Sequence, residues 1–190
     1  MINNNDEILI KKVKDFINNN SQLTKIFTHH KVKYPIDDML KNILIILKIG
    51  ISYRDIQKHT FINWNTIYKF NLKLIKYNIF EKIFNKTINS YLNEMKNTST
   101  TYFTDTTFIC NKLGEDLTSN NPQIKKHKTS KISIITDDFN IPLSIRIDTG
   151  STHDSTILKE QLIDIHNKHP QIFNQTNILI ADGAAEHYEN

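Results

Sequence analysis

Apolar residues recur at intervals of three and four along the first half of the chain, which is the spacing of amphipathic helices. Residues at the predicted boundaries agree with this pattern, since Gly50 follows an apolar run and both Ser52 and Asn63 are helix-capping types. We therefore expect a helical first half. The predicted helices cover residues 6–18, 39–49, 53–59 and 63–76.

The last two of these helices, a short one and then a longer one after a brief turn, have the outline of a helix-turn-helix. In that motif the second helix lies in the major groove of DNA. The turn at residues 60–62 contains no glycine, and many helical bundles share this outline. DNA recognition and a purely structural bundle therefore both remain open, and Trp64 fits either a DNA contact or a core anchor.

The second half changes to the pattern of strands after a polar linker at residues 95–101. β-branched and aromatic residues, alternation of apolar and polar positions, and a turn at residues 137–140 predict strands that include a hairpin. The final strand is a continuous apolar run, as expected in a sheet covered on both faces. The predicted strands cover residues 102–110, 131–136, 141–147 and 178–181.

One helix is predicted among these strands, over residues 155–168. Asp154 is placed to cap it, and Leu158, Leu162 and Ile165 form its expected buried stripe. The fold class is therefore α/β (α+β). We expect a helical module over residues 1–97 and a strand-rich module over residues 98–190.

Composition limits the class of protein. Among 190 residues Cys110 is the only cysteine, which excludes an intramolecular disulfide and a multi-thiolate zinc site. The longest uninterrupted apolar run, Ile43 to Leu47, is far short of the roughly 20 residues that a membrane helix needs. We expect a soluble, intracellular protein without a membrane partner.

Charge is distributed unevenly. Residues 1–97 hold 16 basic and 8 acidic residues, 16 − 8 = +8, and residues 98–190 hold 8 and 12, 8 − 12 = −4. A basic module beside an acidic one suggests a polyanion-binding part joined to a part that gathers carboxylates. The alternative is that an AT-rich coding sequence has raised the lysine content throughout.

Two aspartates interrupt apolar strands: Asp105 within residues 102–110, and Asp182 at the exit of the last strand. A carboxylate in such a place is unfavourable unless it is paired, hydrogen-bonded or bound to a cation. Carboxylates from two neighbouring strands can hold Mg²⁺. Either residue alone could instead end its strand and accept hydrogen bonds from turn amides.

Several short blocks follow one another in a fixed order along the chain. The blocks in the second half are Thr104–Thr107, Lys128–Lys131, Ile141–Ser144, Gly150–Ser155 and the run ending in Asp182; those in the first half are Tyr34–Asp38, Gly50–Ile56 and Asn65–Tyr68. Taken in order, the second set resembles the blocks of DDE-type insertion-sequence transposases over residues 101–186. The helical half is also similar to the region that precedes the catalytic core in that family.

The resemblance implies a ribonuclease-H-like core in which Asp105 and Asp182 are catalytic and bind Mg²⁺ or Mn²⁺, with DNA at the ends of a mobile element as the substrate. The family's third acid, a glutamate, lies on a helix well after the second aspartate. Only eight residues follow Asp182 here, and Glu186 and Glu189 are poor substitutes. We expect a truncated transposase whose enzymatic status is undecided. The alternative is a DNA-binding remnant that is not catalytic, or a regulatory partner of an intact transposase. The expected protein partners are an intact transposase or further copies of this chain in an oligomer.

Other residues have weaker assignments. A cationic strip before and within the second strand could contact phosphate, or could be a solvated strand edge. Arg54 is a further weak DNA-binding candidate. His153 and Asp154 resemble a family pair near the core helix, although capping also explains Asp154; His166 and His169 fit favourable placement near a helix end better than metal ligation. The strip consists of Lys125, Lys126, His127, Lys128 and Lys131.

Overall fold

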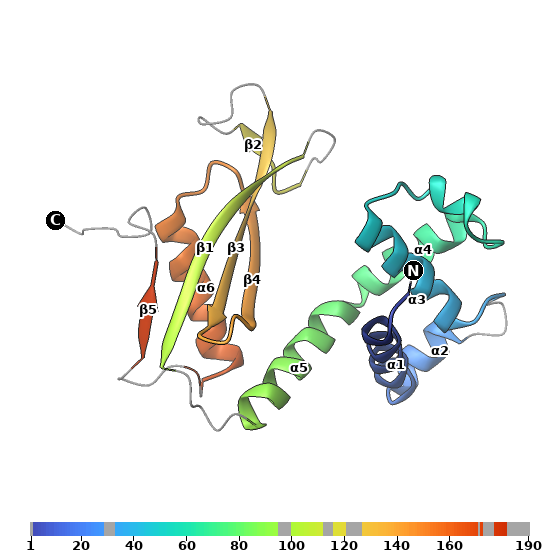
Figure 1. Ribbon diagram of the computed structural model, residues 1–190, viewed down its shortest axis with the longest axis horizontal. Helices are drawn as coiled ribbons and strands as arrows, with labels where there is room; N and C mark the ends of the chain where they lie inside the picture. The colour runs from blue at the N-terminus through green and yellow to red at the C-terminus, as the bar shows by residue number, and fades with distance from the viewer. Residues whose placement is uncertain are drawn as a thin grey trace. The chain divides into compact units, whose positions relative to one another are not determined.

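A computed structural model describes residues 2–28, 33–94, 100–111, 116–120, 127–170, 172 and 177–181 (Figure 1). The chain divides into two compact units, Met1–Thr87 and Ile88–Asn190. This division falls inside a helix, Ile79–Glu94, ten residues (97 − 87) before the boundary that the sequence pattern placed in the polar linker.

The first unit is helical, as predicted. Its helices are α1 (Asn4–Asn18), α2 (Ser21–Phe27), α3 (Ile36–Ile49), the 3-10 helix η1 (Asp55–Lys58), α4 (Trp64–Lys76) and the start of α5 (Ile79–Glu94). The sequence pattern did not single out α2 and α5. Capping follows local chemistry: the Asn63 side chain accepts a hydrogen bond from the amide of Asn65, and Gly50 ends α3 in the left-handed region at φ 72°.

One apolar core holds the helices of this unit together. Phe27 is fully buried and makes edge-to-face contacts with Phe70 and Tyr77, with ring centroids 5.5 Å and 6.1 Å apart. Trp64 packs, partly buried, against the same core, which agrees with the anchor interpretation of this residue. The best-buried members of this core, apart from Phe27, are Ile17, Ile43, Ile56, Ile67, Leu74 and Ile79.

The second unit contains a mixed five-stranded sheet. Its strands are β1 (Thr101–Cys110), β2 (Ser119–Asn120), β3 (Lys128–Asp137), β4 (Pro142–Thr149) and β5 (Ile178–Ile180). β3 pairs antiparallel with β1, β2 and β4, and β5 pairs parallel with β1. The chain is therefore α/β, as expected.

No helix in the described ranges is long and apolar enough to cross a membrane.

Helix α6 (Asp154–Lys168) lies against one face of this sheet (Figure 1). The contact is unusually polar: the Oγ of Ser133 donates to Oε1 of buried Gln161 at 2.6 Å, and Nε2 of Gln161 lies 3.1 Å from the Oγ of Ser144. The predicted buried stripe is confirmed at Ile165 and wrong at its other two positions. Ile157 and Gln161 are buried in place of Leu158 and Leu162, which are only half-buried.

The opposite face of the sheet carries apolar side chains that the described residues leave open. Ile145 and Ile147 are 51 % and 49 % exposed, and Ile178 and Ile180 are 59 % and 48 % exposed. The expectation that β5 is covered on both faces is therefore not met within the described residues. The pairing of β3 with β4 has a register shift between Ile135 and Thr136 of β3. This shift breaks the alternation of buried and exposed side chains in β4: Leu143 is buried, whereas Ile145, two residues later, is exposed.

Candidate functional site

Asp105 lies in the middle of β1 with an exposed side chain. It pairs with Ile134 of β3, which in turn pairs with Ile145 of β4, so the three side chains form one row on the open face of the sheet. Its Oδ1 accepts a hydrogen bond of 2.7 Å from the amide of Thr106, the next residue. The carboxylate therefore emerges from an apolar surface and is accessible to solvent.

The strand that precedes Asp182 is the direct neighbour of the strand that bears Asp105. β5 pairs with the start of β1, with Thr101 opposite Ile178 and Phe103 opposite Ile180. Asp182 itself lies outside the described residues, which end at Ala181, and so do Glu186 and Glu189. Two strands that are far apart in the sequence thus lie side by side where the sequence predicts a shared site.

Asp105 offers the donor chemistry of a hard-cation site, a carboxylate with one local hydrogen bond. No three His, Cys, Asp or Glu side chains within the described ranges are grouped closely enough to hold a metal ion. Asp154 is not a partner for Asp105. The Oδ1 of Asp154 lies 3.4 Å from the Oγ1 of Thr106. The Thr106 side chain points to the opposite face of β1 from the side chain of Asp105.

Lys131 and Asp154 form a buried ion pair on the α6 side of the sheet. Nζ of Lys131 lies 2.6 Å from Oδ1 of Asp154 and 2.8 Å from the carbonyl oxygen of Thr152, and 4.9 Å from the ring centroid of Phe108. Only 6 % of Lys131 is exposed. The alternative of a solvated strand edge is therefore wrong at Lys131, since its ammonium is enclosed by protein groups. Its contact with phosphate stays a prediction.

His153, rather than Asp154, is the N-cap of α6. Its Nδ1 accepts a hydrogen bond of 3.3 Å from the amide of Ser155, and Asp154 is the first helical residue. The capping assignment of Asp154 is thus corrected: its carboxylate is held by Lys131 instead. The sequence pattern did not indicate this pair, because the apolar residues Ile132 and Ile134 alternate out of phase with Lys131.

The remaining cationic candidates are spread over both units. Lys128 is exposed at the start of β3, and Lys125 and Lys126 lie outside the described residues. Arg54, in the first unit, is exposed, with its guanidinium carbon 5.6 Å from the centroid of the Trp64 ring. Both Lys128 and Arg54 keep the accessibility that phosphate contact requires, whereas Lys131 is buried.

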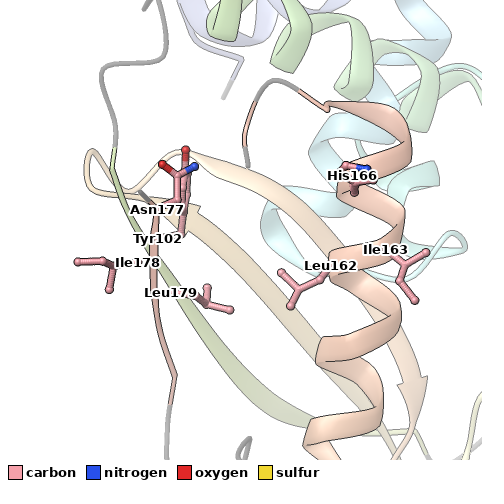
Figure 2. Close-up of a pocket in the computed structure, with 7 residues that line it drawn as sticks. All are labelled: Tyr102, Leu162, Ile163, His166, Asn177, Ile178 and Leu179. Carbon is pink, nitrogen blue, oxygen red and sulfur yellow. The ribbon is translucent and has the colours of Figure 1, made fainter. Parts of the chain in front are cut away.

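The two histidines near the end of α6 have different surroundings. His169 is buried, its Nδ1 lies 2.8 Å from Oδ1 of Asn89, and burial, followed by the charge of Lys168, lowers its pKa. His166 is exposed and lines an apolar groove of about 450 Å³ between α6 and β5, shown in Figure 2. Within the described part of the chain, neither residue belongs to a group of three His, Cys, Asp or Glu side chains that could hold a metal ion. The groove is otherwise lined by Tyr102, Leu162, Ile163, Asn177, Ile178 and Leu179.

Comparisons with known proteins give little further information. No protein-family model matches the chain, and no curated protein matches it. Among solved structures it is similar to a chain of the structure described as "Crystal structure of a pre-cleavage Mos1 transpososome", at 9% sequence identity and a TM-score of 0.31. The similarity covers 96% of this chain and 72% of that chain. At this identity and TM-score the similarity carries no functional assignment.

Proposed function

We propose that this chain is part of a DDE-type transposase, in which Asp105 and Asp182 contribute to a Mg²⁺ or Mn²⁺ site for cleavage and transfer of DNA strands. The pairing of β1 with β5 supports this proposal. Paired residues differ by 77 positions (178 − 101), and Asp105 and Asp182 differ by the same 77 (182 − 105). The strand that leads to Asp182 is therefore the direct neighbour of the strand that carries Asp105.

The chemistry of this face agrees with the proposal. A carboxylate exposed among apolar side chains makes little contribution to packing, and Asp105 has the oxygen donors that Mg²⁺ and Mn²⁺ prefer. In a two-metal arrangement, one divalent ion would activate the attacking oxygen and the other would stabilise the leaving oxygen of a phosphodiester. Asp105 and Asp182 would be two of the ligands that hold and orient the metal. The family pattern has a further acid as the third ligand.

The test combines metal binding with DNA cleavage. Mn²⁺ is titrated into the full chain and followed by electron paramagnetic resonance, and nicking of supercoiled DNA is measured at the same Mn²⁺ concentrations. We expect both Asp105→Asn and Asp182→Asn to weaken Mn²⁺ binding and to abolish any nicking. Asp164→Asn, an exposed aspartate on α6, is the matched control. Equal behaviour of Asp105→Asn and the control would overturn the proposal.

A second candidate function, DNA binding without catalysis, is favoured by the charge of the first unit. Residues 1–87 contain 15 basic and 7 acidic residues, 15 − 7 = +8. Such a chain would occupy element ends, or act as a regulatory partner in an oligomer with an intact transposase. Salt-sensitive DNA binding that is the same in wild type, Asp105→Asn and Asp182→Asn, without metal-dependent nicking in any of them, would identify this function.

A further inference from the structure

A cationic groove lies in the first unit between the start of α3 and one side of α4. Its volume is about 470 Å³. The groove has an apolar floor, since Met39 and Phe70 are both buried. Its remaining lining residues are polar, aromatic or cationic: Lys33, Tyr34, Asn63, Thr66, Lys69 and Lys73.

The positive charge of this groove is concentrated and locally uncompensated. None of the described residues that line it is acidic, and neither Lys33 nor Lys69 forms an ion pair with a described carboxylate. Lys33 and Lys69 are exposed. Three ammonium groups around one concave surface repel one another, and a bound anion relieves that repulsion.

Lys73 differs from the other two lysines because the fold fixes its position. Its Nζ donates to the carbonyl oxygen of Ile26 at 3.3 Å and lies 5.6 Å from the ring centroid of Phe27. The Lys73 side chain is thus held in place, whereas the exposed side chains of Lys33 and Lys69 can move towards a ligand. Asn63 and Thr66, which line the same groove, are residue types that also contact DNA phosphates.

We propose that this groove binds the phosphate backbone of duplex DNA, with Lys33 and Lys69 contacting phosphates and Lys73 adding a fixed charge. The inference rests on the proposed function and deepens it, since it assigns the DNA contact of the helical unit to a surface other than Arg54 and the Lys125–Lys131 strip. Duplex DNA is favoured because the groove is open, cationic and bordered by hydrogen-bonding side chains, and because the whole unit carries a net charge of 15 − 7 = +8.

The test measures the affinity of the full chain for a fluorescein-labelled duplex by anisotropy over a series of NaCl concentrations. The variant is Lys33→Gln/Lys69→Gln, and the matched control is Lys11→Gln/Lys12→Gln, which removes two exposed charges from α1 of the same unit. We expect the groove variant to bind about tenfold more weakly and its salt slope to fall by about 2. The control variant should keep the wild-type slope. Unchanged thermal unfolding of both variants shows that folding is intact, as expected for exposed lysines.

Each other result has a defined meaning. Equal losses in the groove variant and the control overturn the groove assignment while DNA binding stands. Binding of poly-glutamate with the same dependence on Lys33 and Lys69, and no preference for the duplex, overturns DNA as the ligand. A groove-dependent duplex affinity combined with Mn²⁺ binding that is indifferent to Asp105→Asn supports the groove and refutes the catalytic proposal. A wild-type chain with no duplex affinity overturns the groove assignment.

Discussion

The ammonium group of Lys131 lies 2.6 Å from the carboxylate of Asp154 and connects β3 to the first turn of α6. The Lys131 side chain is 7 % exposed and that of Asp154 is 23 % exposed, so removal of the carboxylate leaves a charge that water reaches poorly. We expect Asp154→Asn to lower the free energy of unfolding by about 3 kcal/mol, as measured by urea denaturation. Lys131→Met should lower it less, because the apolar stem is kept and Asp154 remains partly hydrated.

Asp164→Asn is the matched control for this ion pair. Asp164 lies on the same helix and pairs with Lys168 at 3.6 Å, with side-chain exposures of 55 % and 43 %. Such an exposed pair contributes about 0.5 kcal/mol or less. If Asp154→Asn and Asp164→Asn change the free energy of unfolding equally, the Lys131–Asp154 pair does not stabilise the junction of β3 and α6.

The open face of the sheet should bind the hydrophobic dye ANS. Ile145 and Ile147 of β4 are half-exposed, on the face that also carries Phe103 and Asp105. Exposed apolar surface of this extent is rare unless a partner covers it. We expect Ile145→Thr/Ile147→Thr to reduce ANS fluorescence while the free energy of unfolding changes by less than about 1 kcal/mol, because threonine also favours strands.

Leu143→Thr provides the contrast on the same strand. Leu143 is 2 % exposed, so the substitution removes buried apolar surface and buries a hydroxyl group, which should lower the free energy of unfolding by about 3 kcal/mol. ANS fluorescence that is as strong in the Ile145→Thr/Ile147→Thr variant as in wild type would contradict the prediction that the dye binds at these two residues.

Periodicity in the sequence predicted where the elements lie better than which way they face. The strand pattern of residues 131–136 and 141–147 was confirmed as β3 and β4. The face that packs on α6 nevertheless includes the polar side chains of Lys131, Ser133 and Gln161, which find partners there. Ile145 and Ile147, by contrast, remain open. An alternation of apolar residues fixes a strand but cannot reveal a bulge that changes which residues are buried.

The candidate site shows the same limit. The apolar run before Asp182 was correctly predicted to be a strand, and its pairing with β1 is a tertiary contact between segments about 77 residues apart (178 − 101), which local patterns do not encode. The cationic groove was also missed, because Lys33, Lys69 and Lys73 converge only when α3 and α4 pack together. The metal-binding roles of Asp105 and Asp182 remain predictions.

Tyr91 should make the second unit less stable at high pH. Its hydroxyl donates to Oδ2 of Asp137; burial, and then this hydrogen bond, raise the pKa of Tyr91 from 10.0 to about 12. Between these values the unfolded chain loses the phenol proton and the folded chain keeps it, so the free energy of unfolding falls as pH rises. Tyr91→Phe should weaken this fall in urea denaturation from pH 10 to pH 12. The same slope in wild type and Tyr91→Phe would contradict the assignment.

His169 should make the same unit less stable at low pH. Burial, with a smaller effect of Lys168, lowers its pKa below 6.5, so the unfolded chain binds a proton more readily than the folded chain. The free energy of unfolding should therefore fall as pH drops below 6.5. We expect His169→Gln to reduce this pH dependence in urea denaturation. His166→Gln, at an exposed position of the same helix, is the matched control. A larger reduction of the pH dependence in His166→Gln than in His169→Gln would refute the prediction.

Asp105 should be dispensable for folding. Its side chain is exposed, its hydrogen bond comes from the neighbouring amide of Thr106, and an asparagine oxygen can accept that bond equally well. We expect Asp105→Asn to change the free energy of unfolding by less than about 0.5 kcal/mol.

Asp105→Leu should leave the free energy of unfolding unchanged or raise it, because Ile134 and Ile145 lie beside it in the same row. An unsatisfied hydrogen-bonding group lowers the free energy of unfolding by about 1–3 kcal/mol. If Asp105→Asn lowers it by about 2 kcal/mol or more, the carboxylate stabilises the folded chain. If stability is kept while Mn²⁺ binding is lost, the charge at position 105 serves a ligand rather than the sheet.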